Sequence, residues 1–319
     1  MERHVAAGID GSPESLAAVH WAAREAVRRG SALHVVHAWE WRPHPSASPA
    51  ADVPRAGWAE RALARVATGV RAAHPGLRVE ERLADEDPVT VLLTEADAAG
   101  LLVLGSRGLS GVAGFLVGSV SQRVVARANR PVVVVRAGVG AAAEHLPVID
   151  GVSPEEIPEV PYRDVVLGLD VGAPGDEHVS CDELVGFAFE AAHRRGAPLR
   201  VVHVFGGGSV RPAPPGADLL AEHARAVVAA VRPWREKWPG TTVAETVTEG
   251  RAADELVRAA AGAGLLVVGR HDRNPRPDAV AGIGSGDDAG HAGHAGRVGP
   301  VTHAVLHHVA CPVAVVPHG

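Results

Sequence analysis

The chain has 319 residues, 46% of them apolar, which allows ordinary buried cores and suggests two domains of roughly 150 residues each. Its formal net charge of −6 at pH 7 argues against a general nucleic-acid-binding protein, because no basic excess exists to neutralise phosphates. We expect a soluble, cytoplasmic protein, since no run approaches the ~20 apolar residues of a membrane helix and no signal peptide precedes the first strand-like segment.

The first 136 residues alternate apolar, strand-like runs with amphipathic, helix-like segments. Strands are predicted at HVAAGID (4–10), LHVVHAW (33–39), LRVEERL (77–83), LLVLG (101–105) and PVVVVR (131–136). Helices are predicted over 12–29, 57–74, 88–99 and about 119–129, and the Pro-, Ala- and Ser-rich stretch 42–56 is expected to be a loop. Ser12 as N-cap, Pro13 at the first helical position and Gly30 at the end favour the first helix.

The second half of the chain repeats the first. Four blocks recur in the same order: 4–10 at 165–170, 28–39 at 194–205, 101–105 at 265–269, and 118–135 at 299–316. The offset grows at the last block, which indicates an insertion of about 17 residues in the second copy. We therefore predict a first domain at 1–140, a linker at 141–161 and a second domain at 162–319, with a Gly-, His- and Asp-rich insertion at about 272–297.

Alternating helices and nearly all-apolar strands predict a parallel sheet covered on both faces. The expected fold is α/β: two tandem three-layer α/β/α domains, each with an open, mostly parallel, five-stranded, Rossmann-like sheet. Right-handed crossovers place the loops that follow the strands at one edge of each sheet. Because ligands of open α/β sheets bind at that carboxyl edge, we expect the functional site there.

The segment GSRGLSGVAGFLVGSVSQ (105–122) is the most informative motif. Gly105 and Gly108 follow a predicted strand, and Gly118 and Ser119 open a predicted helix. Glycines between a strand and a helix let backbone N–H groups approach a phosphate closely, since no Cβ intervenes. The alternative is a structural glycine turn without a ligand.

A carboxylate is expected beside this loop, because Asp10 ends the first predicted strand. Asp10 and Ser12 could also serve only to cap the following helix, and the two interpretations are compatible.

The spacing G-x2-G-x9-G-[S/T] resembles the nucleotide loop of universal stress proteins of the ATP-binding class, here as two tandem copies with an actinomycete-like composition. The resemblance implies a fold related to the adenine nucleotide alpha hydrolases, and ATP as the ligand, with or without Mg²⁺. It implies nucleotide contacts in the first copy at Gly8, Asp10, Ala38, Leu104, Gly105, Gly108, Gly118, Ser119, Val120 and Ser121.

The second copy departs from this pattern. Its matching positions are Gly168, Asp170, Val204, Gly269, Gly299, Val301 and Thr302. Asp272 replaces the second loop glycine and would direct negative charge at a triphosphate, and Pro300 replaces the first hydroxyl and removes a backbone donor. We expect a degenerate site with a regulatory or structural role. A substitute phosphate loop at Gly284 and Ser285 is the alternative.

Histidines in the insertion raise a metal hypothesis. The spacing of His291 and His294 matches no closed metal site and no cysteine pair accompanies them, so no specific metal site is predicted.

Nothing in the sequence demands an enzyme. It contains no G-x4-G-K-[ST] loop, no G-x-S-x-G elbow and no evident nucleophile–base pair. The resemblance implies a protein that binds an adenine nucleotide and acts in stress response and regulation with an unidentified protein partner, with slow ATP hydrolysis left open. It also implies pairing of the last strands, which two copies can satisfy within one chain, and a further homodimer remains open. Two alternatives stand beside it: an ATP-using enzyme of the adenine nucleotide alpha hydrolase type, and a structural interaction protein with empty sites.

Overall fold

The computed structural model describes residues 3–39, 53–106, 117–147, 160–172, 181–206, 217–271 and 298–319. The first half contains β1 (Val5–Ile9), α1 (Pro13–Arg29), β2 (Leu33–Trp39), α2 (Val53–Ala73), β3 (Val79–Asp85), α3 (Pro88–Ala98), β4 (Leu101–Gly105), α4 (Ser119–Arg127) and β5 (Val132–Val135). A short 3₁₀ helix, η2 (Ala141–Glu144), lies in the predicted linker. The second half repeats the order: β6 (Val165–Gly168), α5 (Asp182–Arg195), β7 (Leu199–Phe205), α6 (Ala217–Lys237), β8 (Val243–Glu249), α7 (Ala252–Ala259), β9 (Leu265–His271), α8 (Pro300–His308) and β10 (Val313–His318).

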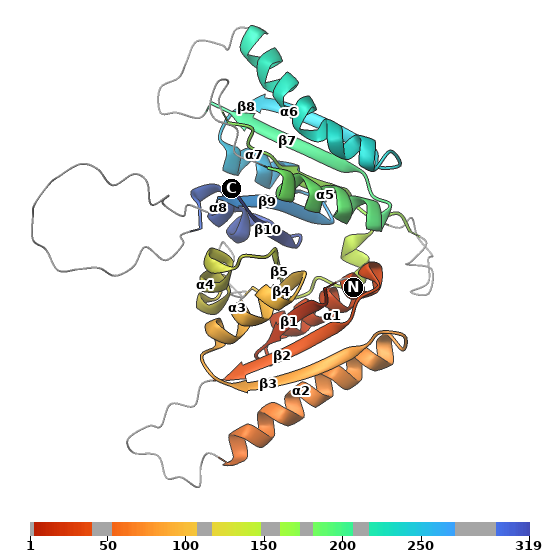
Figure 1. The fold of residues 1–319 in the computed structure, drawn as a ribbon, viewed down its shortest axis with the longest axis vertical. Coiled ribbons are helices and arrows are strands. Elements are labelled where there is room, and N and C mark those ends of the chain that lie inside the picture. The colour runs from red at the N-terminus through yellow and green to blue at the C-terminus, as the bar shows by residue number, and fades with distance from the viewer. Residues whose placement is uncertain are drawn as a thin grey trace, which may run out of the picture.

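The strands form one ten-stranded sheet in the order β3-β2-β1-β4-β5-β10-β9-β6-β7-β8 (Figure 1). All pairs within each half are parallel. The halves join where β5 and β10 pair antiparallel, with Val133 opposite Ala314. The predicted pairing of the two last strands is therefore met within this chain.

Helices cover both faces of this sheet, and each face has its own core (Figure 1). Helices α1, α2, α5 and α6 pack on one face, and α3, α4, α7 and α8 pack on the other. Successive strand residues alternate between the cores, as a period of two requires: Val5 and Ala7 face α1, whereas Ala6 faces α3. The predicted class, two tandem three-layer α/β/α domains, is confirmed.

Most element boundaries follow the predicted signals. Ser12 caps α1 by accepting a hydrogen bond from the Ser15 N–H at 3.2 Å, and Gly30 ends the helix in the left-handed region (φ 62°). The prediction of a loop through residue 56 was wrong at its end, because α2 already begins at Val53. Pro54 permits this start, since proline is tolerated in the first turn of a helix.

Buried charges hold the two halves together between α1 and α5. Glu25 of α1 is 1% exposed and accepts hydrogen bonds from Arg195 of α5 and from Arg29, each at 2.7 Å. Burial alone would raise the pKa of Glu25, but Arg195, Arg28 and Arg29 hold it well below its usual range. The carboxylate is therefore ionised wherever the protein is folded near neutral pH.

Arginines also cross between the halves on the other face. Arg136, directly after β5, donates to the carbonyls of Leu306 and Val309 at the end of α8. Arg270 of β9 donates to the Ala128 carbonyl at the end of α4, at 2.6 Å. Each half thus binds the last carbonyls of the other half's final helix, where a cation is favoured by the helix dipole. Among the described helices, none is both long and apolar enough to cross a membrane.

Candidate functional site

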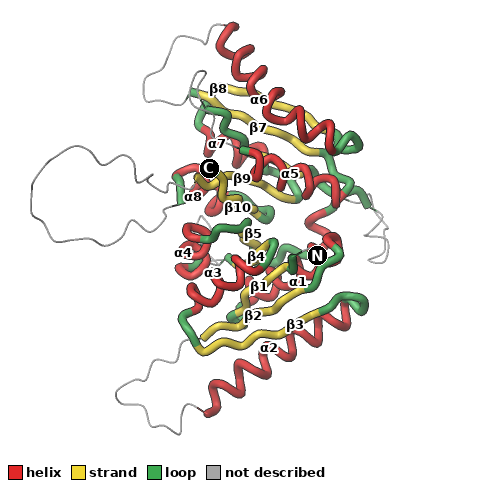
Figure 2. The backbone as a smooth tube through the Cα atoms, in the orientation of Figure 1, coloured by secondary structure: helices red, strands yellow, loops and turns green. Residues whose placement is uncertain are grey.

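The strand order of the first half reverses between β1 and β4. The chain steps from β1 outward to β2 and β3, and then returns to the other side of β1 with β4 (Figure 2). Ligands of open α/β sheets bind outside the carboxyl ends of the strands at such a reversal. Asp10 directly follows β1 and Gly105 ends β4, so the structure brings these two predicted residues to the same edge.

Asp10 is exposed, and its carboxylate is held by a hydrogen bond from a nearby backbone N–H. Its Oδ1 accepts the backbone N–H of Ser12 at 3.0 Å, and Gly11 between them has φ 82°, a left-handed conformation that favours glycine. The helix-capping interpretation of Asp10 and Ser12 therefore describes real contacts, and the Asp10 residue is exposed at the carboxyl end of β1.

At two of the predicted glycines, Gly105 and Gly8, an added Cβ would clash with neighbouring atoms, so packing alone accounts for a glycine there. A Cβ on Gly105 would lie 2.6 Å from the backbone carbon of Glu14 and 2.7 Å from the Ser15 nitrogen, so β4 ends against the first turn of α1. A Cβ on Gly8 would lie 2.8 Å from Leu104 Cδ2 and 2.9 Å from Leu92 Cδ2. Leu104 itself is 3% exposed, so its side chain is part of the core and only its backbone is left for the predicted ribose contact.

The start of α4 has the features of an anion site. Gly118 is the N-cap with extended backbone, and within the described part of the chain no side chain caps this end. Ser119 is exposed, and Val120 is partly exposed. The first N–H groups of a helix without a cap are available to a ligand, and the helix dipole favours an anion there.

Ser121 has a more structural role than the sequence suggests. Its hydroxyl donates to the Gly105 carbonyl at 3.0 Å, and in the second half Thr302 donates to the Gly269 carbonyl at 3.1 Å. Both halves thus fasten the glycine-loop helix to the end of the preceding strand. Its predicted phosphate contact stays a prediction.

Sequence reasoning missed His37 and Trp58 at this edge. His37 of β2 is 5% exposed, and its Nδ1 has no hydrogen-bond partner among the described residues. Burial lowers the pKa of His37, and the nearby Asp10 carboxylate opposes part of that shift. Trp58 of α2 is 53% exposed, lies edge-on to the His37 ring with centroids 6.4 Å apart, and reaches Gly11. His37 and Trp58 meet only because α2 packs against β2, and no local sequence motif indicates that packing.

At the corresponding edge of the second half, the described side chains contact one another. His203 is the counterpart of His37, and both its nitrogens are bonded: Nδ1 to the Leu169 carbonyl and Nε2 to His223 Nδ1, each at 2.9 Å. The His223 ring stacks on Phe205 with centroids 4.5 Å apart. His318 of β10 occupies the space toward which a Cβ on Gly269 would point.

The remaining predicted positions of the second copy lie at places in the fold that correspond to those of the first copy. Asp170 lies two residues beyond β6 and is exposed, Gly299 is the N-cap of α8, and Pro300 is its first residue. The other predicted positions are Gly168 and Val204, near the ends of β6 and β7, and Val301 in α8. Several residues singled out from the sequence lie outside the described residues: Gly108, Asp272, Gly284, Ser285, His291 and His294.

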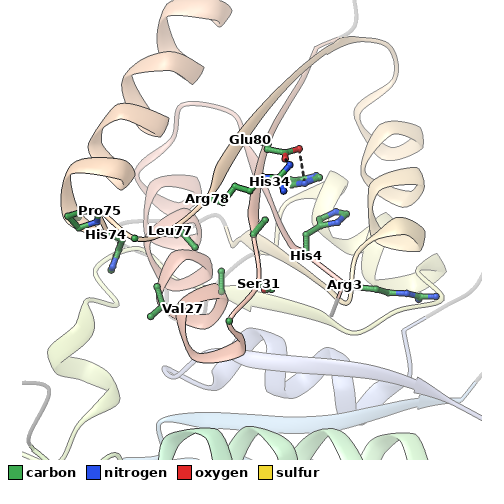
Figure 3. A pocket seen from close by; sticks show the side chains of 15 residues that line it. Arg3, His4, Val27, Ser31, His34, His74, Pro75, Leu77, Arg78 and Glu80 are labelled. Atoms are coloured by element: carbon green, nitrogen blue, oxygen red, sulfur yellow. Dashed lines mark ion pairs between the residues drawn. The ribbon is translucent and has the colours of Figure 1, made fainter. Parts of the chain in front are cut away.

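A cavity lies at the opposite, amino edge of the first domain's sheet. This open hollow of about 1050 Å³ is lined by residues around the starts of β1, β2 and β3 and the ends of α1 and α2, among them His4, His34 and Glu80 (Figure 3). It is remote from the carboxyl edge, whose neighbouring segments 40–52 and 107–116 are outside the described residues.

Comparison with known proteins establishes the relationship. The universal stress protein family model matches residues 1–136 and 161–317. The chain is 30% identical to universal stress protein Rv2005c of Mycobacterium tuberculosis over 98% of this chain and 96% of that protein. It is 29% identical to a universal stress protein of Mycolicibacterium smegmatis over 85% of this chain and 88% of that protein. The crystal structure of a universal stress protein from Archaeoglobus fulgidus shares the fold, with a TM-score of 0.65, 17% identity and coverage of 99% of this chain and 98% of that one. This chain belongs to the universal stress protein family, as a tandem of two family domains.

Proposed function

We propose that the first domain binds an adenine nucleotide, ATP, at the carboxyl edge of β1 and β4, and that the protein serves stress response and regulation by binding rather than by catalysis. The observation that carries this proposal is the helix start at Gly118, which has no side-chain cap among the described residues and lies beyond the strand-order reversal. Membership of the universal stress protein family supports the biological role.

Each part of the edge suits a different part of a nucleotide. Backbone N–H groups at Gly118, Ser119 and Val120 would bind phosphate oxygens with help from the dipole of α4. The exposed carboxylate of Asp10 and the backbone near Ala38 would meet the sugar and base. Gly108 is expected to join the phosphate contacts, as the glycine spacing predicts.

His37 and Trp58 extend this proposal beyond the predicted residues. The buried Nδ1 of His37, which has no hydrogen-bond partner in the described part of the chain, would gain one from a bound nucleoside, which would offset the cost of burying a polar atom. The exposed ring of Trp58 offers an apolar wall at the same edge.

The second domain is proposed to bind nucleotide weakly or not at all. Pro300 lacks the N–H that Ser119 has at the first position of the helix, and His203, His223 and Phe205 pack together at that edge. A regulatory or structural role suits it better.

A proline exchange tests the proposal. Ser119→Pro gives the first domain the helix start of the second, and because proline is accepted at this position the fold should be retained. Removing a phosphate-binding N–H and a hydroxyl should weaken ATP binding by about 10-fold or more, measured by calorimetric titration with Mg²⁺ present. Pro300→Ser is the matched control and should leave the affinity of the first domain unchanged. An unaltered affinity in a folded Ser119→Pro protein would exclude this site.

The two alternative functions predict different results in the same titration. An adenine nucleotide alpha hydrolase would convert ATP to AMP and pyrophosphate in the presence of an acceptor, which chromatography of the titrated mixture detects. A purely structural protein would give no heat of binding and would contain no nucleotide after gentle purification. One bound nucleotide recovered unchanged is the result expected here.

A further inference from the structure

A cluster of two histidines and a buried glutamate lies at the amino edge of the first domain, away from the proposed nucleotide site. His4 precedes β1, His34 is in β2, and Glu95 is in the last turn of α3. Glu95 is 3% exposed, and its Oε1 lies 2.9 Å from both His4 Nε2 and His34 Nδ1. The three ligand atoms lie within 4.8 Å of one another.

The hydrogen bonds of this cluster require a cation. His34 has carboxylate oxygens at both ring nitrogens, because its Nε2 lies 3.2 Å from Glu80 Oε2 (Figure 3). With His4, three imidazole nitrogens therefore face carboxylate oxygens, whereas two neutral imidazoles have only two N–H groups. One contact is repulsive unless a further proton or a metal ion supplies the missing positive charge. The rings of His4 and His34 stack with centroids 3.6 Å apart, which disfavours charging both.

The fold does not need this cluster, as the second domain shows. By strand register and repeat alignment, His4, His34 and Glu95 correspond to Asp164, Arg200 and Ala259. There Arg200 Nε pairs with Asp164 Oδ2 at 2.8 Å, and its NH2 group donates to the Ala259 carbonyl at 2.7 Å. In the second domain one ion pair thus occupies the corresponding place in the sheet. The histidines and the buried carboxylate of the first domain therefore have a role other than stabilising the fold.

We propose that His4 Nε2, His34 Nδ1 and Glu95 Oε1 form a binding site for Zn²⁺, with water from the adjoining cavity in the remaining position. Two histidines and one glutamate with an open position are a ligand set that Zn²⁺ accepts. Tetrahedral bonds of about 2.0–2.1 Å place ligand atoms roughly 3.3 Å apart, so the present 2.9 Å contacts need to open by only a few tenths of an ångström. Glu80 holds Nε2 of His34 and thereby directs the Nδ1 lone pair at the metal.

The end of α3 favours a cation at this place, and the cavity leaves the site accessible. The site adjoins the C-terminal end of α3, where the helix dipole is negative. Arg82 pairs with the other oxygen of Glu95, at 2.5 Å, which leaves Oε1 for a single metal bond. His4, His34 and Glu80 line the open cavity, so ion and water can enter. The sequence gives no hint of this site, because Glu95 is 91 positions from His4 and 61 from His34.

Zinc titration of the full-length, untagged protein tests the proposal. After removal of metals with a chelator, titration with ZnCl₂ at neutral pH should show one tight equivalent. The triple variant His4→Asp, His34→Arg, Glu95→Ala installs the residues of the second domain and should fold while losing that equivalent. Glu80→Gln should weaken the site by about 10- to 100-fold, as loss of a partner that orients a ligating histidine does.

Two controls separate this site from other histidines, of which the chain has 18. His74→Ala removes a histidine that lines the same cavity outside the cluster, and it should leave the tight equivalent unchanged. His291→Ser with His294→Ser tests the insertion in the same way. Substitution with Co²⁺ should give the intense visible absorption of a four-coordinate site, which the triple variant should lose.

Either of two results would overturn the proposal. If the wild-type protein takes up no tight zinc equivalent, the cluster is completed by a proton alone. If the tight equivalent persists in the folded triple variant, zinc is bound by other residues.

Discussion

The two domains share a fold and differ at both edges of the sheet. At the carboxyl edge, the first domain has an unpartnered His37 nitrogen among the described residues and an exposed Trp58, whereas the second has a bonded and stacked set of His203, His223 and Phe205. At the amino edge, the first has a buried glutamate with two histidines where the second has one ion pair. Contacts that hold elements together are kept, as Ser121 and Thr302 show.

This comparison separates residues that stabilise the shared fold from residues that are particular to one domain. A residue kept in both halves with the same contact serves the fold, and a polar residue buried in only one half needs a local explanation. Glu25, for example, corresponds to Ala191 by the repeat alignment, while the adjacent arginine pairs 28–29 and 194–195 recur. The buried acids of the first domain are therefore the places where the comparison can be tested.

The largest effect is expected for Glu25→Ala, which gives α1 the residue that α5 has. Arg195 is 2% exposed on its side chain and would lose its carboxylate partner inside the protein. Leaving one partner of a buried ion pair unpaired costs about 3–5 kcal/mol, which urea unfolding would detect as a lower free energy of unfolding.

Two further variants identify the cause of that loss. Glu190→Ala removes a carboxylate from the same interface whose side chain is 32% exposed, and it should cost no more than about 1 kcal/mol. Adding Arg195→Met to Glu25→Ala should recover part of the stability, since no buried charge is then left unpaired. Equal losses from Glu25→Ala and Glu190→Ala would show that burial does not increase the contribution of Glu25 to the free energy of unfolding.

Much of the fold was predictable because its signals are local or repeated. The internal repeat, the apolar strands and the Ser12–Pro13 helix start each depend on neighbouring residues, and the structure agrees with them. The edge location of Asp10 and Gly105 was also predictable, because parallel strands end together. Boundaries shifted where propensity is weak: β3 begins at Val79 rather than residue 77.

What escaped prediction depends on packing between distant segments. Trp58 meets His37 only because α2 covers β2, and His318 covers Gly269 only because β10 continues beside β9. Arg136 reaches the end of α8 through the antiparallel pairing of β5 with β10. Sequence spacing indicates which residues share an element face, but not which faces meet across the sheet.

A pair of glycine substitutions sharpens the comparison of the carboxyl edges. In Gly105→Ala the new Cβ meets backbone atoms of Glu14 and Ser15 at 2.6–2.7 Å, and the start of α1 must shift. We expect a loss of about 1–3 kcal/mol, as for other overpacked sites. In Gly269→Ala the new Cβ meets first the end of the His318 side chain rather than backbone atoms, so the loss should be smaller. Thermal unfolding of both variants measures the difference, and equal losses would show that the two edges are packed alike.

The last expected effect is a difference in acid sensitivity, and its sign follows from Glu25. Its pKa in the folded protein is held well below the value of about 4.3 for an unfolded glutamate, so the unfolded state binds the proton more readily. The stabilisation is complete above the unfolded pKa and is lost as the pH falls from there toward the folded pKa. Between these values Glu25 contributes a slope of about 1.4 kcal/mol per pH unit to the free energy of unfolding. In Glu25→Gln, urea unfolding across this acidic range should show a slope smaller by that amount. A wild-type slope in Glu25→Gln would place the acid sensitivity in other carboxylates and would remove the main electrostatic difference between α1 and α5.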